Sequence, residues 1–176
     1  MPHVHADHGF GQTGKRMDID VKKIIEELDT DKTAVLESRS AADTAALGQR
    51  LGEICAPGQI YTLTGDLGVG KTVFTQGFAR GLGVEGPVNS PTFTILQVYE
   101  DGRMPFYHFD VYRIADVEEM EEIGYEDCFY GEGVCLIEWA NLIEEILPED
   151  SIQVTIEKDL GKGFDYRRIH VKRFSK

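Results

Sequence analysis

The chain has 176 residues, which suits one compact α/β domain with a real hydrophobic core. With 31 acidic and 18 basic residues its formal net charge is −13, which disfavours autonomous nucleic-acid binding because that affinity depends on Lys and Arg contacting phosphates. It has three cysteines and no CxxC pair, no apolar run of about eighteen residues and no signal peptide, so we expect a cytoplasmic protein without disulfides or a membrane span.

The first 32 residues differ in composition from the rest, and we expect a flexible leader there, with one short helix over residues 21–28. Three histidines lie near its start: His3, His5 and His8. They are compatible with metal binding, but no second ligand cluster accompanies them, so an unstructured leader is the preferred interpretation. Residues 33–176 are expected to form a single P-loop ATPase domain.

The predicted domain begins with a short strand over residues 33–36 and a helix that Ser40 caps. A second strand, residues 60–64, leads into a glycine-rich turn, and a helix follows from Lys71 to about Leu82. The elements expected after that helix are a hairpin (92–99 and 105–113), a helix (116–129), a buried strand (134–137), a helix through about residue 146, and a hairpin (152–156 and 167–171). This order predicts an α/β, P-loop NTPase-like three-layer fold with a mixed, mainly parallel central sheet and antiparallel hairpins.

The glycine-rich turn fits the pattern G-x-x-x-x-G-K-[ST] at every specified position. It consists of Gly65, Asp66, Leu67, Gly68, Val69, Gly70, Lys71 and Thr72. Glycines let successive backbone N–H groups point inward, and the following helix directs its N-terminal dipole to the same place. We therefore expect this turn to bind the phosphates of a nucleoside triphosphate, with Lys71 against the β- and γ-phosphates and Thr72 as a Mg²⁺ ligand.

A P-loop site also needs an acid that holds Mg²⁺ or its waters, usually at the end of a neighbouring buried strand. Glu138 follows a continuous apolar run, so it is the preferred metal-linked acid. Asp110 ends a less buried strand and is expected to be a second active-site carboxylate. The alternative for Asp110 is a salt bridge with Arg113.

The segment Asn89–Phe93 lies where P-loop switches place a loop that senses the γ-phosphate, with Thr92 as a possible hydroxyl donor. A proline-stiffened entry into a strand explains it equally well. Trp139 is expected to be a core or interface residue, since its position after Glu138 alone does not make it catalytic. His108 and Cys135 are expected to be packed structural residues, because no catalytic partner for them is recognisable.

Four segments in one order, GDLGVGKT, SPTF, HFDVYR and CLIEW, make the chain resemble the bacterial TsaE family, formerly called YjeE. The resemblance runs from about Val35 to Val171. Members are ATPase components of the machinery that makes threonylcarbamoyladenosine in tRNA.

The resemblance implies that Thr72 and Glu138 hold Mg²⁺, that Lys71 contacts the phosphates of ATP, and that Asp110 is needed for activity. It also implies that the protein docks on a TsaB–TsaD heterodimer, where weak ATP hydrolysis becomes faster. Because the chain is acidic, we expect tRNA to be reached only indirectly, through these partners.

Two other functions remain open from the sequence. A small-molecule P-loop kinase needs several arginines around the transferred phosphoryl group, and only Arg80, Arg103 and Arg113 lie between the P-loop and Glu138. A nucleotide-dependent binding module without meaningful turnover is the second alternative. A GTPase is disfavoured because no Asn-Lys-x-Asp motif occurs.

Overall fold

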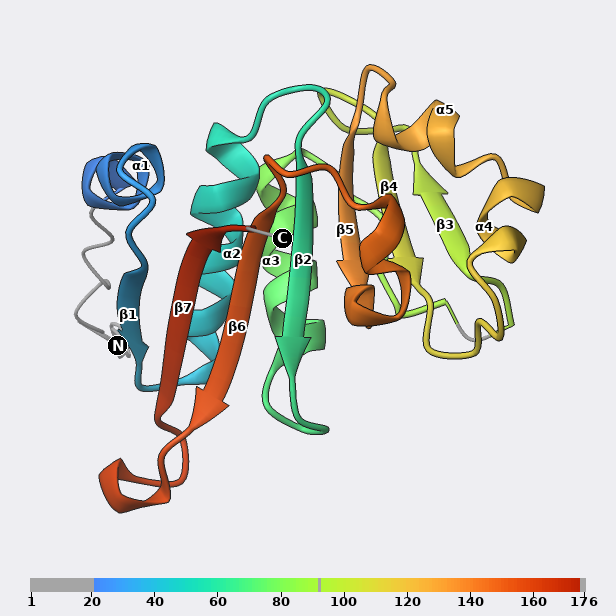
Figure 1. The fold of residues 1–176 in the computed structure, drawn as a ribbon. Coiled ribbons are helices and arrows are strands. Elements are labelled where there is room, and N and C mark those ends of the chain that lie inside the picture. Colours follow the sequence, from blue (N-terminus) through green and yellow to red (C-terminus); the bar gives the residue numbers. More distant parts are fainter. Residues whose placement is uncertain (1–20, 92, 175–176) are drawn as a thin grey trace, which may run out of the picture.

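Seven strands form one sheet in the computed structural model, which describes residues 21–91 and 93–174 (Figure 1). The strands are β1 (Ala34–Ser38), β2 (Ile60–Gly65), β3 (Leu96–Tyr99), β4 (Phe106–Asp110), β5 (Val134–Glu138), β6 (Ile152–Lys158) and β7 (Arg167–Arg173). Their order across the sheet is β1-β7-β6-β2-β5-β4-β3.

The centre of the sheet is parallel and its two sides are antiparallel. Strand β2 pairs in parallel with β5 and β6, and β5 pairs in parallel with β4. The hairpins β3–β4 and β6–β7 and the pair β1–β7 are antiparallel. All five residues of β5 are buried, as expected for a central parallel strand covered on both faces. The predicted fold class, including both hairpins, is confirmed.

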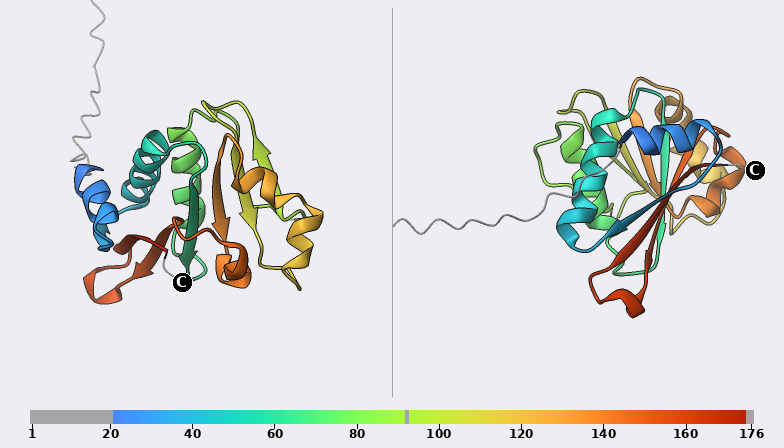
Figure 2. Two further views of the ribbon diagram at one scale, coloured as in Figure 1. Left: turned by 45° about the horizontal axis from the view of Figure 1, so that its top comes forward. Right: turned by 90° about the vertical axis from the view of Figure 1, so that its left-hand side faces the viewer.

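Helices cover both faces of the sheet (Figure 2). One face carries α1 (Val21–Asp29), α2 (Ala41–Ile54) and α3 (Lys71–Gly81), and the apolar cluster beneath them includes Ile24, Leu51 and Phe78. The other face carries α4 (Glu118–Glu122), α5 (Tyr125–Phe129) and the 3₁₀ helix η1 (Ala140–Ile146), with Met120 and Phe129 in their cluster. A short 3₁₀ turn, η2 (Leu160–Lys162), lies between β6 and β7. Within the described ranges no helix is long and apolar enough to cross a membrane.

Several element boundaries differ from the sequence predictions. The single helix expected over residues 116–129 is wrong: Gly124, with φ 72°, separates two five-residue helices. The helix expected after Glu138 consists of 3₁₀ turns with a kink at Ile143. Strand β3 begins at Leu96 rather than at Thr92, which lies outside the described residues. The Ser40 cap is confirmed, since the N–H of Asp43 donates to the Ser40 hydroxyl at 3.1 Å.

The helix α1 lies where the short helix of residues 21–28 was expected, and it packs on the edge of the domain. Ile24 is fully buried and Leu28 is 7% exposed, both in the cluster beneath α2 and α3. Arg173 of β7 donates to the Leu28 carbonyl at 3.2 Å and pairs with Asp29 at 3.7 Å. The three histidines considered as metal ligands lie outside the described residues.

Helices α2 and α3 touch through their backbones because glycines occupy the contact. A methyl group at any of four glycines would overlap a backbone oxygen of the other helix. These are Gly48 and Gly52 of α2 and Gly77 and Gly81 of α3. The close contact fixes α3 against the rest of the domain, and thereby fixes its N-terminus, where Lys71 and Thr72 lie.

Replacing Gly77 with alanine should destabilise the fold, since the added methyl has no space against the Ala45 carbonyl. Overpacking of this kind costs about 1–3 kcal/mol, measurable as a lower midpoint of urea unfolding. Gly86→Ala is the control, because nothing lies within 4 Å of its Cβ position, and it should leave the midpoint unchanged. Equal midpoints for the two variants would show that the helices have room to separate.

Candidate functional site

The glycine-rich turn links the carboxyl end of β2 to the first turn of α3. Gly68 and Gly70 adopt left-handed conformations, with φ 75° and 113°, which non-glycine residues rarely adopt. The Val69 side chain is buried and its N–H donates to the Asp66 carbonyl at 3.2 Å. Gly70 precedes α3 and offers no side-chain cap. The N–H groups that begin α3 therefore remain available to an anion held in the turn.

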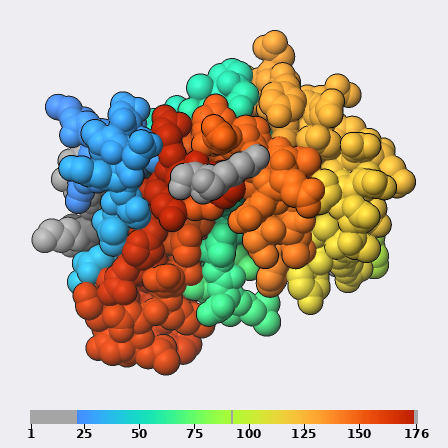
Figure 3. Space-filling model, viewed as in Figure 1, coloured from blue at the N-terminus to red at the C-terminus, as the bar shows by residue number. Residues whose placement is uncertain are grey.

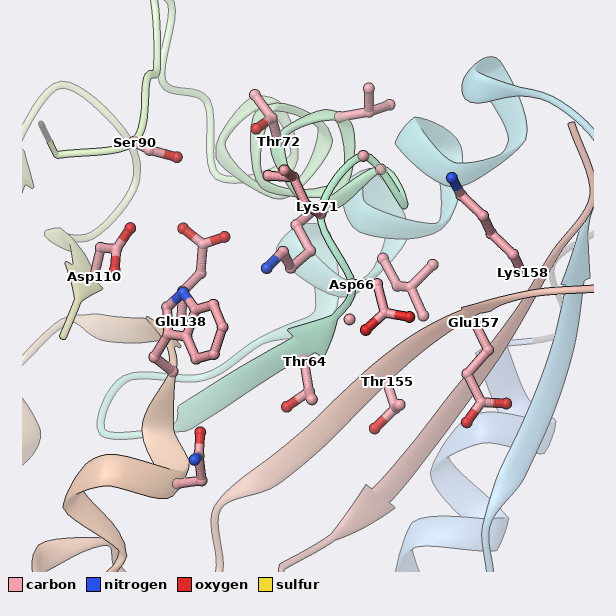
Figure 4. Close-up of a pocket in the computed structure, with 18 residues that line it drawn as sticks. Thr64, Asp66, Lys71, Thr72, Ser90, Asp110, Glu138, Thr155, Glu157 and Lys158 are labelled. Carbon is pink, nitrogen blue, oxygen red and sulfur yellow. The ribbon is translucent and has the colours of Figure 1, made fainter. Parts of the chain in front are cut away.

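This turn borders a cleft of about 1140 Å³ at the carboxyl edge of the parallel strands (Figure 4). Every predicted site residue lines it except Val69, whose side chain is buried in the core. The cleft is large enough for a nucleotide, since small-molecule pockets commonly measure about 300–1,000 Å³. It lies where open α/β sheets generally bind their ligands.

Asp110 and Glu138 occupy equivalent positions at the ends of β4 and β5 and are paired in the register of these strands. Both carboxylates point into the cleft on the side where the Lys71 ammonium lies (Figure 4). Asp110 accepts a hydrogen bond from the N–H of Tyr112 at 3.1 Å. In the part of the chain that the structure describes, Asp110 forms no ion pair with Arg113, so the alternative drawn from the sequence is not found.

His108 is a packed residue, as expected, but it also contacts the site. Its ring is 1% exposed, and Nε2 lies 3.3 Å from Oε2 of Glu138. Its Nδ1 has no hydrogen-bond partner among the described residues. His108 therefore supports the Glu138 carboxylate from beneath and does not face the cleft.

Trp139 contributes to the site in a way that its sequence position did not reveal. The Lys71 Nζ lies 5.2 Å from the centroid of its ring, a cation–π geometry, and the Tyr112 ring packs on the same indole at 4.9 Å. Trp139 has φ 62° and lines the cleft directly after Glu138. Its indole therefore holds the Lys71 ammonium beside the two carboxylates.

The remaining walls of the cleft come from β6, which no feature of the sequence connected to it, and from the segment that contains Ser90. Thr155, Glu157 and Lys158 of β6 line the end away from the carboxylates, because β6 is the neighbour of β2 (Figure 4). Ser90 lines the cleft near Asp110, so the segment expected to sense the γ-phosphate does reach it. No signal in the sequence fixes the position of β6 beside β2.

The oxygen groups at the cleft suit a hard cation such as Mg²⁺, which prefers oxygen ligands. Thr72 supplies a hydroxyl at the start of α3, and Glu138 and Asp110 supply carboxylates across from it. Within residues 21–91 and 93–174 no three His, Cys, Asp or Glu side chains gather closely enough to hold a metal alone. A cation here would need phosphate oxygens and waters as its other ligands, which is how Mg²⁺ is normally bound with nucleotides.

The three cysteines are free and buried. Burial raises the pKa of each thiol, that of Cys55 to about 11. They are therefore protonated packing residues and not nucleophiles, as expected for Cys135.

Asp110 carries the most informative shift at the site. Burial raises its pKa above the ordinary value and the nearby Glu138 carboxylate raises it further, whereas the Tyr112 N–H, His108 and Lys71 lower it. The folded state therefore binds the Asp110 proton more tightly than the unfolded state. The free energy of unfolding therefore falls as pH rises through the raised pKa of Asp110. Below the ordinary pKa of aspartate the carboxyl is protonated in both the folded and the unfolded state, so Asp110 causes no such loss there.

Asp110→Asn should therefore raise the melting temperature of the nucleotide-free protein at pH 7.5, and this gain should shrink as the pH approaches 4. The amide oxygen can still accept from the Tyr112 N–H, so the local turn survives. Melting curves at both pH values, with the exposed Asp150→Asn as control, measure the effect. A lower melting temperature at pH 7.5 would contradict the assignment of burial as the main cause.

The chain is similar in sequence to proteins of one family. The family model described as threonylcarbamoyl adenosine biosynthesis protein TsaE matches residues 38–168. A protein of Bacillus subtilis (strain 168), named tRNA threonylcarbamoyladenosine biosynthesis protein TsaE, is 50% identical over 127 residues, which are 72% of this chain and 77% of the relative. A protein of the same name from Treponema pallidum (strain Nichols) is 45% identical over 119 residues, 68% of this chain and 87% of the relative.

The crystal structure of Bacillus subtilis YdiB has a similar fold. It superposes with a TM-score of 0.66 at 41% sequence identity, covering 80% of this chain and 84% of that chain. Residues 38–168, which the family model matches, contain the glycine-rich turn, Asp110 and Glu138. The family match and the shared fold thus agree, and the chain belongs to the TsaE family of tRNA threonylcarbamoyladenosine biosynthesis proteins.

Proposed function

We propose that the protein binds ATP with Mg²⁺, hydrolyses it weakly, and thereby supports the threonylcarbamoyl modification of tRNA adenosine in a complex with TsaB and TsaD. The observation that carries this proposal is the meeting of a G-x-x-x-x-G-K-T turn with two carboxylates from adjacent strand ends in one cleft. Membership of the TsaE family supports the pathway, and the geometry of the cleft supports the nucleotide.

Each side chain has a defined task in this proposal. Backbone N–H groups of the glycine-rich turn other than that of Val69 bind the phosphates, and Lys71 leaves the Trp139 ring to contact the β- and γ-phosphates. Thr72 and Glu138 would hold Mg²⁺, directly or through waters. Asp110 would orient the attacking water. The bound Mg²⁺ would neutralise charge that develops on the phosphate oxygens.

The cleft favours an ATPase over a small-molecule kinase. Kinases of this class clamp the transferred phosphoryl group with arginines. No arginine lines the cleft among the described residues, and the cations at its walls are Lys71 and Lys158. The residues that surround the phosphates thus suit transfer to water, assisted from outside by a partner, better than transfer to a bound acceptor.

The charge of the chain constrains its partners. A net charge of −13 argues against tight contact with tRNA by the isolated protein, so tRNA is reached through TsaB and TsaD. The free, buried thiols are compatible with the reducing cytoplasm.

Mg-ATP or Mg-ADP should raise the melting temperature of the wild-type protein. A ligand at a hundred times its Kd stabilises a fold by about 2.7 kcal/mol through mass action. Lys71→Ala should lose most of this shift, whereas Lys172→Ala, an exposed lysine of β7, should keep it. The absence of a shift with any nucleotide at saturating concentration would contradict nucleotide binding.

Phosphate release from ATP should be slow for the isolated protein and several-fold or more faster when TsaB and TsaD are added. Glu138→Gln should abolish the stimulated rate while the protein still folds, because the amide keeps the shape but loses the charge that holds Mg²⁺. Transfer of phosphate to a free nucleoside or nucleotide, detected by chromatography, would instead support a kinase.

A further inference from the structure

Arg167 ties the glycine-rich turn to the connection between β6 and β7. Its Nε donates to the Val69 carbonyl at 2.8 Å, and its Nη1 donates to the carbonyls of Phe164 and Tyr166, each at 2.8 Å. Three carbonyls from two distant segments therefore share one guanidinium. The connection forms a lobe beside the glycine-rich turn, as Figures 1 and 3 show.

The carbonyl that Arg167 holds belongs to the peptide unit between Val69 and Gly70. A trans peptide is planar, so its C=O and N–H point in opposite directions. Arg167 and Gly70 line a recess of about 190 Å³ behind the turn, and Gly70 also lines the cleft in front of it. With the carbonyl held toward the recess, the N–H of Gly70 points toward the cleft, where phosphates would lie.

This peptide unit can rotate because one of its two neighbours is glycine. Rotation changes the ψ of Val69 and the φ of Gly70, and Gly70, with φ 113°, can take either sign of φ at little cost. A rotated peptide would direct the Val69 carbonyl oxygen into the cleft, where it would repel phosphate and remove one donor. A side chain that holds the carbonyl on the other side would prevent this rotation.

We propose that Arg167 is a positioning residue for nucleotide binding: by holding the Val69 carbonyl, it keeps the Gly70 N–H directed at the phosphates. The proposal rests on the proposed function of the same turn. Arginine suits the task because its planar guanidinium presents several fixed donors and remains charged at all relevant pH values. Lysine can reach one carbonyl but cannot bridge the turn and the β6–β7 connection in the same fixed geometry.

The neighbouring Arg168 provides a control, because its substitution distinguishes a positioning role of Arg167 from general support of the β6–β7 hairpin. Its Nη2 lies 3.2 Å from Oδ2 of Asp159, and its guanidinium lies 5.9 Å from the Tyr166 ring centroid. It contacts the same β6–β7 connection but makes no hydrogen bond to the glycine-rich turn among the described residues. Arg168→Ala therefore removes a cation from the connection without releasing the Val69 carbonyl.

The test is the affinity for Mg-ADP, measured by titration calorimetry for the wild type, Arg167→Ala, Arg167→Lys and Arg168→Ala. Losing a charge-assisted hydrogen bond that fixes a phosphate donor should weaken binding about tenfold in Arg167→Ala. Arg167→Lys should fall between Arg167→Ala and the wild type, and Arg168→Ala should bind as the wild type does. Hydrogen exchange of nucleotide-free protein should also become faster in residues 66–72 of Arg167→Ala alone.

A purely structural role predicts a different result: both alanine variants melt at lower temperature while their affinities stay at the wild-type value. That result, or unchanged exchange in residues 66–72, would overturn the proposal and leave the proposed function intact. If wild-type protein fails to bind Mg-ADP, the proposed function fails and this inference fails with it. If Arg167→Ala does not fold, a wild-type affinity in Arg167→Lys is the contradicting result.

Discussion

The parallel register of β2, β5 and β4 brings the site together. Leu63 of β2 lies opposite Glu138 of β5, and Glu138 lies opposite Asp110 of β4, so the three strands end at one edge. The glycine-rich turn leaves the same edge two residues later. A shift of one residue in β5 would direct the Glu138 side chain to the opposite face of the sheet. All five residues of β5 are buried, so such a shift would displace packed side chains on both faces of the strand.

Charge at this edge is balanced only in part. Two carboxylates lie close together in a partly buried place, and burial raises the pKa of one of them, Asp110. The nearby cation is Lys71, which lies over the Trp139 ring. A cation bound between the carboxylates and phosphates would relieve the repulsion, and phosphates would give Lys71 an anionic partner. The arrangement therefore gains most from binding both ions together, which is what an ATP site with Mg²⁺ requires.

Much of the fold followed from local patterns. The Ser40 cap, both hairpins and the buried strand that ends in Glu138 were predictable, because turn residues and apolar runs report directly on short segments. The break at Gly124 was not, since an acidic helical pattern runs through it, whereas the left-handed conformation of Gly124, with φ 72°, separates α4 from α5.

The features of the site likewise divide into those that the sequence predicts and those that it does not. The phosphate-binding turn and the strand-end acids were visible in the sequence because each depends on residues close together in the chain. The contacts of Lys71 with Trp139 and of Arg167 with Val69 were not, because they join segments 68 and 98 residues apart whose proximity depends on strand order.

The central claim is tested most directly by a crystal structure with Mg²⁺ and a non-hydrolysable ATP analogue. We predict phosphate oxygens within hydrogen-bond distance of the N–H groups of Gly68 and residues 70–72, and Mg²⁺ on the Thr72 hydroxyl with Glu138 bound to it or to its waters. An analogue bound elsewhere, with the glycine-rich turn unchanged and empty, would contradict the account.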